Sequence, residues 1–169
     1  MMTILDVVGP LEVPFYKGKG GRTIRDEDVE AFWTTNRHYK HRRGCYVFGR
    51  RAGKGYTPGY VGLAVKNLGQ EVFAHHKLSR YQQFLVEYAC GTPILFFIIS
   101  PEKRGKPNAT QLHKIERFLI NLGLTANPRL LNQHFTTPEN WGIRGVVRGG
   151  KGKTARGTVS FRQMMGITK

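Results

Sequence analysis

The sequence predicts an α+β domain built on a small three-stranded antiparallel sheet with helices packed around it. Two short runs of strand-forming residues, 45–50 and 58–64, are joined by a glycine-rich loop, which is typical of a β-hairpin. A third run, 92–100, is apolar along its length and predicts a strand that is buried on both faces in the middle of the sheet. Helical patterns lie before, between and after these strands.

Each expected helix carries a start signal or an apolar stripe. The first begins at Asp26, where three acidic residues favour a helix N-terminus. Two short helices, 68–76 and 80–89, each follow a capping-box pattern, and 110–124 has apolar residues at helical spacing. The core elements therefore follow the order β-β-α-α-β-α, after a short strand expected at 11–15.

A chain of 169 residues is long enough for one domain with a hydrophobic core. We expect an N-terminal extension with one helix at 1–43 and a core at 44–134. A basic, glycine-rich C-terminal extension follows at 135–169.

Positive charge dominates the chain. Lysine and arginine number 27 against 11 acidic residues, which gives a formal net charge of +16, and no Asp or Glu occurs between Glu30 and Glu71. We therefore expect a nucleic-acid partner whose binding weakens steeply with salt. A basic surface that serves solubility, or that binds an anionic membrane, is the alternative. The residues expected to contact nucleic acid lie in and after the hairpin and in the tail: Arg50, Arg51, Lys54, Lys66, Arg148, Lys151 and Lys153.

The tail contains the sequence GKGKT, which is similar to part of a phosphate-binding loop. That motif needs a glycine five residues before Gly152, and Val147 stands there. We therefore interpret the tail as a basic extension that contacts nucleic acid.

Cysteine usage and hydropathy predict a cytoplasmic protein. Cys45 and Cys90 are far apart in the sequence and show neither a disulfide pattern nor the CxxC spacing of a metal site. The N-terminus lacks a basic region and is interrupted by Asp6, so no signal peptide is expected. The longest apolar run, 93–99, is shorter than the ~20 residues that span a bilayer, so no membrane partner is expected.

Two tripeptides and the elements after them resemble a known family. The tripeptide GCY at 44–46 is followed by YVG at 60–62, and then by a helix, a buried strand and a helix that ends near NPRLLN. This ordered set resembles the GIY-YIG nuclease superfamily over residues 44–134. The resemblance implies a small nuclease domain, and both flanking segments lie outside it.

The resemblance implies that Tyr46 and Tyr60 project into one active-site cleft. One of them would assist deprotonation of the attacking water, and the other would orient water or phosphate. A free tyrosine titrates near ~10, so this role needs cations or a metal that favour the phenolate. Gly44 and Gly62 are the motif glycines, and Asn132 matches a structural asparagine of the family. The alternative is two aromatic residues that pack across a hairpin.

Glu116 matches the metal-binding glutamate of the family, and its position gives independent support. At 100° per residue it falls between Leu112 and Ile120, inside the apolar arc of its helix. A carboxylate is expensive to bury unless it is paired or coordinates a cation. Because Mg²⁺ binds one or two carboxylates together with waters and phosphates, Mg²⁺ or Mn²⁺ is the expected cofactor. An ion pair with a nearby basic side chain is the alternative.

One position departs from the family. The catalytic arginine of the family falls here on Glu71, which cannot stabilise charge on a scissile phosphate. Lys66, Lys77 or Arg80 could supply the missing cation. Otherwise Glu71 contributes to metal binding in an active site that differs from that of the family, or catalysis is lost. His75, expected on the same helix face as Glu71, falls where some family members place a histidine that aids proton transfer; a structural hydrogen bond to Glu71 is the alternative.

These features predict a divalent-metal-dependent endonuclease that hydrolyses phosphodiester bonds of nucleic acid, with DNA as the expected substrate. A restriction or anti-phage enzyme that acts as a homodimer is a subclass of this hypothesis. The alternative is a non-enzymatic nucleic-acid-binding module with the same fold. Both predict salt-sensitive binding, so a cleavage assay is needed to separate them.

Overall fold

The computed structural model describes residues 3–101, 107–132, 141–146 and 152–167. The strands are β1 (Thr3–Glu12), β2 (Tyr16–Gly18), β3 (Gly21–Thr23), β4 (Gly44–Ala52), β5 (Gly55–Ala64), β6 (Thr92–Ile99) and β7 (Trp141–Ile143). The helices are α1 (Asp26–Thr35), the 3-10 helix η1 (Arg37–Tyr39), α2 (Leu68–Glu71), α3 (His75–Glu87), α4 (Ala109–Ala126) and α5 (Thr158–Met164).

The prediction of a three-stranded antiparallel sheet was wrong. The α+β fold contains a five-stranded mixed sheet in the order β5-β4-β6-β1-β7 and a separate two-stranded sheet of β2 and β3. β1 pairs antiparallel with β6, and β7 pairs parallel with β1. Both additional strands come from segments outside 44–134. The short strand expected at 11–15 coincides only with the last two residues of β1. Sequence patterns did not reveal the rest of β1 because Asp6 and the Gly9-Pro10 pair interrupt its apolar residues, and the strand changes register between Val8 and Leu11.

The main sheet has helices on both faces. On β4, Cys45 and Val47 point into a core shared with α4 and α5, whereas Tyr46 and Phe48 point into a core shared with α1, α2 and α3. The residues of β6 alternate between the same two cores, so this strand is buried on both faces in the middle of the sheet, as expected. The two tyrosines of the motifs therefore belong to the face that α3 covers.

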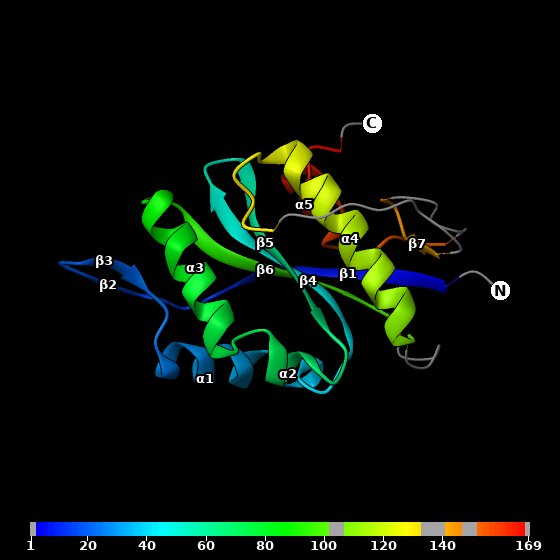
Figure 1. Cartoon of the computed structure of the whole chain (residues 1–169), viewed down its shortest axis with the longest axis horizontal. Helices are drawn as coiled ribbons and strands as arrows, with labels where there is room; N and C mark the ends of the chain where they lie inside the picture. The colour runs from blue at the N-terminus through cyan, green and yellow to red at the C-terminus, as the bar shows by residue number, and fades with distance from the viewer. Residues whose placement is uncertain (1–2, 102–106, 133–140, 147–151, 168–169) are drawn as a thin grey trace.

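Figure 1 shows how the outlying elements are arranged around this sheet. The β2–β3 hairpin projects at one end of the molecule, and β7 and the N-terminus lie at the opposite end. α1 and α2 lie along the lower edge of the view, below α3.

Local signals predicted some helix ends correctly and others wrongly. α1 begins at Asp26, and the Asn67 side chain accepts a hydrogen bond from the first turn of α2, both as expected. The helix expected to begin after Ser79 in fact begins at His75, and the Ser79 hydroxyl donates back to the His75 carbonyl at 3.3 Å. Because α2 ends at Glu71, the expectation that Glu71 and His75 share one helix face was wrong.

Candidate active site

A surface pocket of about 620 Å³ lies where the first half of α3 passes the edge strand β5. Tyr60 of β5 forms one wall. The other lining residues are His75, His76, Ser79, Arg80 and Gln83 of α3, and Leu131 from the segment after α4. The sequence had singled out Tyr60, His75 and Arg80 from this set.

The remaining polar lining residues follow from helical spacing. His76 precedes Arg80 by four residues, and Gln83 follows it by three, so all three lie on one face of α3. This signal is present in the sequence once Arg80 is assigned to the site. It was missed because the helix was expected to begin after Ser79.

Lys77 is the basic residue that contacts a motif tyrosine most directly. Its Nζ donates a hydrogen bond to the Tyr60 hydroxyl at 2.6 Å and lies 4.9 Å from the centroid of the same ring. Tyr60 itself is 9% exposed and lines the pocket. The structure thus places a cation beside Tyr60, which Glu71 could not provide, although neither Lys77 nor Glu116 lines the pocket.

Tyr46 lies beneath Tyr60 and has no access to the pocket. The two ring centroids are 6.4 Å apart, and Tyr46 is completely buried. Burial raises the pKa of Tyr46 far above that of a free tyrosine, and the neighbouring Tyr60 adds to this effect. Its hydroxyl makes no hydrogen bond of normal geometry within the described residues, and the nearby Tyr81 hydroxyl opposes the rise in the pKa of Tyr46. Tyr46 is therefore unsuited to act as a phenolate base.

Tyr81 is a second buried tyrosine in this layer. Its hydroxyl donates to the Val72 carbonyl at 2.6 Å, and its ring stacks on Phe48 with centroids 4.0 Å apart. Burial raises the pKa of Tyr81 well above its ordinary value. Together with Tyr46 it forms an aromatic floor that fixes the ring of Tyr60, whose centroid lies 6.1 Å from that of Tyr81.

The two motif glycines are required by packing. A Cβ atom at Gly62 would overlap the ring of Tyr46, which lies directly across that position. A Cβ at Gly44 would overlap the carbonyl oxygen of Ile98 on the adjacent strand β6. The glycines therefore allow close approach of a ring and of a neighbouring backbone, and neither supplies chemistry.

Asn132 binds the free edge of β5 beside Tyr60. Its side-chain amide donates to the carbonyl of Val61 at 2.7 Å and accepts from the N–H of the same residue at 2.8 Å. The N–H of Leu131 donates to the carbonyl of Gly59 at 3.0 Å. These contacts satisfy edge groups on both sides of Tyr60, which keeps that side chain in place and protects the strand from pairing with other chains.

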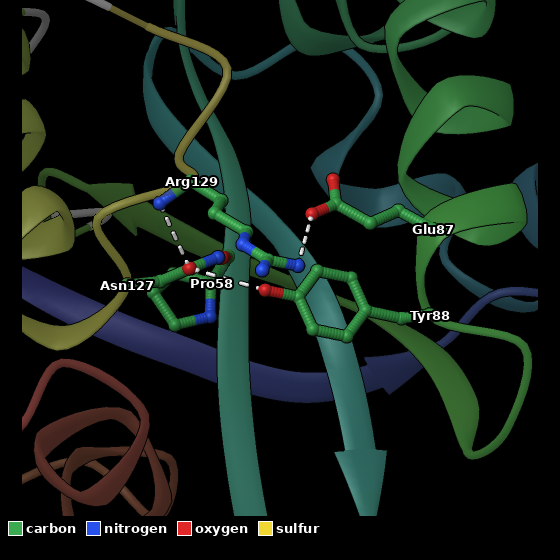
Figure 2. Close-up of polar contacts among 5 residues, drawn as sticks. All are labelled: Pro58, Glu87, Tyr88, Asn127 and Arg129. Atoms are coloured by element: carbon green, nitrogen blue, oxygen red, sulfur yellow. Dashed lines mark hydrogen bonds and ion pairs between the residues drawn. The ribbon is translucent and has the colours of Figure 1, made fainter.

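A second asparagine, Asn127, also forms a hydrogen bond to the edge of β5, as Figure 2 shows. The Asn127 amide donates to the carbonyl of Pro58 at 2.7 Å, and its oxygen accepts from the Tyr88 hydroxyl and the Arg129 N–H, both at 3.1 Å. Arg129 also pairs with Glu87 of α3 at 3.0 Å. The segment after α4 is thus tied to both β5 and α3, the two elements that form the pocket.

Glu116 lies on α4 with its side chain 21% exposed. Burial raises the pKa of its carboxyl group, and the nearby charges of His113 and Lys77 oppose this effect. The same carboxylate contributes to the raised pKa of Tyr46. Glu116 is therefore within electrostatic range of both the Lys77–Tyr60 pair and the buried tyrosine.

A single carboxylate in this environment suits a hard divalent cation. Mg²⁺ binds to proteins through one or two carboxylates while keeping waters and substrate phosphates as its other ligands. A cation would also relieve the cost of a partly desolvated carboxylate. Within the described ranges, no group of three or more His, Cys, Asp and Glu residues could hold a metal on its own. Glu116 would thus need oxygen ligands from water and substrate.

The arginines expected to contact nucleic acid in the hairpin have partners within the protein. The Arg50 guanidinium donates to the Cys90 carbonyl at 3.1 Å and lies 4.4 Å from the Tyr88 ring centroid. Arg51 forms an ion pair with Glu12. Three other expected contacts are exposed, namely Lys54, Lys66 and Lys153, whereas Arg148 and Lys151 lie outside the described residues. The glycine-rich loop therefore offers less available charge than its sequence suggests.

Comparisons of the chain with protein-family models, with curated proteins and with solved structures find no match. In the part of the chain that the structure describes, no helix is both long and apolar enough to cross a membrane. The geometry of the pocket is therefore the basis for the function proposed below.

Proposed function

We propose that the protein is a divalent-metal-dependent endonuclease that hydrolyses phosphodiester bonds of DNA. The observation that supports this most strongly is the 2.6 Å contact between the Lys77 ammonium and the hydroxyl of Tyr60, a residue that also lines the pocket. Lys77 itself is not among the residues that line the pocket. Phosphodiester hydrolysis needs a group that orients water and positive charge that stabilises the phosphate. The residues that line the pocket include a tyrosine, a serine, two histidines and an arginine.

The start of α3 is suited to bind the phosphate. His75, His76 and Arg80 line the pocket there. The N-cap residue of α3, Ala74, offers no side-chain hydrogen bond to the first turn. Backbone N–H groups at a helix N-terminus attract anions, and the three side chains add hydrogen-bond donors beside them. In this proposal the scissile phosphate lies between the start of α3 and Tyr60.

Tyr60 and Lys77 form the working pair of the proposed site. The Tyr60 hydroxyl orients the attacking water, and the Lys77 ammonium holds the hydroxyl oxygen in place and provides positive charge near the phosphate. Lys77 thereby takes the place of the arginine that GIY-YIG nucleases, which the sequence resembles, carry at the position corresponding to Glu71. Tyr46 supports the ring of Tyr60 from below and touches neither water nor substrate.

Glu116 is the residue that would hold the divalent cation. When bound, such a cation supplies Lewis-acid stabilisation of the phosphate and acidifies a bound water. The partial burial of the Glu116 carboxylate makes cation binding more favourable than at a fully solvated carboxylate, because less hydration has to be given up.

A binding module without catalysis is the second candidate function. It is favoured by the burial of Tyr46, which removes one of the two tyrosines from the chemistry. In that case the basic surface would bind nucleic acid, and the pocket would accept a phosphate without cleaving it.

Cleavage assays distinguish the two functions. The protein is incubated with supercoiled plasmid, single-stranded DNA and structured RNA in the presence of Mg²⁺ or Mn²⁺. The endonuclease proposal predicts nicking of the plasmid that falls by about 100-fold or more in Glu116→Gln. Glu30→Gln, the same change at an exposed carboxylate of α1, serves as the control and keeps the wild-type rate. If the folded wild type cleaves no substrate with either metal, the binding module is the better description.

A further inference from the structure

The segment between α1 and β4 carries a dense group of basic side chains. Residues 37–43 read RHYKHRR, and no acidic residue occurs from 31 to 70. We use the name basic patch for five exposed or half-exposed basic side chains of this segment together with one lysine that follows β5: Arg37, His38, Lys40, His41, Arg43 and Lys66. Arg42 is also half-exposed, but its guanidinium donates to the carbonyl of Ser100, and it is not included. Of the residues in the patch, only Lys66 is among those that the sequence predicts to contact nucleic acid.

Backbone contacts hold the basic patch beside α2. The N–H of Gly69 donates to the carbonyl of Lys40 at 2.9 Å. Arg43 donates through its Nε to the carbonyl of Lys66 at 3.3 Å. These contacts bring the two parts of the patch together at the edge where α1 and α2 lie (Figure 1). The charges are therefore presented by a fixed surface.

The side chains of Lys40, Tyr39 and His38 also have defined positions in this segment. A Cβ atom at Gly69 would come within 3.2 Å of the Cε atom of Lys40, so the Lys40 stem lies over the first turn of α2. Tyr39 anchors the segment from the other side, since its ring packs on Phe97 with centroids 5.9 Å apart. The ring of His38 rests on that of Tyr39 at 3.9 Å.

Within the described part of the chain, no carboxylate forms an ion pair with the basic patch. Arg51 of the hairpin, by contrast, pairs with the carboxylate of Glu12. Uncompensated, fixed positive charge is the feature that releases counterions from a nucleic-acid backbone.

The basic patch and the pocket lie at the two ends of α2. β5 carries Tyr60 and ends at Ala64, two residues before Lys66. At its other end, α2 is followed closely by His75, which lines the pocket. A backbone that crosses α2 from the patch therefore arrives at the start of α3.

We propose that the basic patch is the main binding surface for the phosphate backbone of duplex DNA, and that it directs one strand into the pocket. The second part rests on the proposed nuclease function. Duplex DNA is favoured over single strands because Tyr39, the only Phe, Tyr or Trp in residues 37–43, turns its ring toward Phe97 and is not free to stack on unpaired bases.

Two matched double variants test this inference. Lys40→Gln/Lys66→Gln removes two exposed lysines from the basic patch, and Lys17→Gln/Lys19→Gln removes two exposed lysines from the β2–β3 hairpin. Glutamine keeps much of the side-chain stem, including the part of Lys40 that covers Gly69. Affinity for a 20-base-pair DNA duplex is measured by fluorescence anisotropy without divalent metal at several salt concentrations, so that cleavage plays no part.

The patch variant is expected to bind the duplex about tenfold more weakly at 0.15 M salt and to reduce the slope of log K against log salt by about 2. The hairpin variant keeps the affinity and the slope of the wild type. Equal losses in both variants, no loss in either, or tighter binding of single-stranded DNA or RNA than of the duplex would overturn the inference. Because this assay requires no catalysis, a protein that binds through the patch and cleaves nothing would contradict the nuclease proposal alone.

Discussion

The two tyrosines of the motifs lie on neighbouring strands with ring centroids 6.4 Å apart, yet their surroundings differ sharply. Tyr60 lines a surface pocket and accepts a hydrogen bond from Lys77. Tyr46 is completely buried, and its hydroxyl makes no hydrogen bond of normal geometry within the described residues. The two tyrosines therefore differ in their access to the pocket and in their hydrogen bonding, although both belong to the same kind of motif.

The order of strands explains this difference. β4 lies between β5 and β6, so a side chain in its middle is covered by neighbours on both sides as well as by the helices above. β5 is the edge strand, and its outer side adjoins the segment after α4 and the start of α3. Tyr60 on the edge strand can therefore line the pocket, whereas Tyr46 on the adjacent strand packs against Tyr60 from within the core.

The largest effect is expected from Lys77, which contacts Tyr60 and leaves Tyr46 untouched. Lys77→Met is expected to reduce the rate of plasmid nicking by about 100-fold, because it removes the charged donor from the Tyr60 hydroxyl. Lys19→Met, on the projecting hairpin, is the matched control and should keep the wild-type rate. A Lys77→Met variant that nicks plasmid at the wild-type rate would remove Lys77 from the site.

Asn132 tests how the edge position of Tyr60 is maintained. Asn132→Ala removes two hydrogen bonds to Val61 and is expected to lower the free energy of unfolding by about 2 kcal/mol. Urea titration followed by circular dichroism measures this change. Asn121→Ala, within α4, provides the comparison and should cost less than about 0.5 kcal/mol. Equal free energies of unfolding in the two variants would show that the hydrogen bonds from Asn132 to β5 contribute little to stability.

The buried tyrosines allow a smaller and more selective test. Tyr46→Phe removes a hydroxyl that makes no hydrogen bond of normal geometry within the described residues and is expected to leave the free energy of unfolding unchanged or to raise it by up to about 1 kcal/mol. Tyr81→Phe removes the hydrogen bond to Val72 and is expected to lower it by about 1 kcal/mol. Urea titration measures both changes. If Tyr46→Phe lowers the free energy of unfolding as much as Tyr81→Phe does, the Tyr46 hydroxyl makes a hydrogen bond.

The pH dependence of stability tests the environment of Glu116. Burial raises the pKa of this carboxyl group in the folded state, so the stability that its protonated form contributes is complete below the ordinary pKa and is lost as the pH rises through the raised one. Glu116→Gln should therefore increase the melting temperature at pH 7, and this gain should vanish below about pH 4. A gain that is the same at both pH values would contradict the burial of the charge.

The sequence predicted the central part of the fold well. The strands expected at 45–50, 58–64 and 92–100 correspond to β4, β5 and β6, and the helix expected at 110–124 corresponds to α4. These elements have continuous apolar or periodic patterns. Most of β1 and the whole of β7 were missed because their pairing joins residues about 90 and 140 positions apart, which local patterns do not encode.

The candidate site was predicted in part for similar reasons. Tyr60, His75 and Arg80 line one pocket, and Lys77 contacts Tyr60, because motif and helix spacing bring these residues together. The burial of Tyr46 depends on strand order, which the sequence does not state. The hydrogen bond that the Arg50 guanidinium donates is accepted by the carbonyl of Cys90, which is 40 residues away in the sequence.

The roles of the two tyrosines are compared by the rate of plasmid nicking in Mg²⁺ by Tyr60→Phe and Tyr46→Phe, measured beside the wild type. The change is the same in both variants, namely the loss of one hydroxyl oxygen. We expect that the wild type nicks the plasmid, that Tyr60→Phe is slower by about 100-fold, and that Tyr46→Phe stays within about threefold of the wild type. Equal loss in the two variants, or a larger loss in Tyr46→Phe, would contradict the division between a tyrosine at the pocket wall and a tyrosine that supports it.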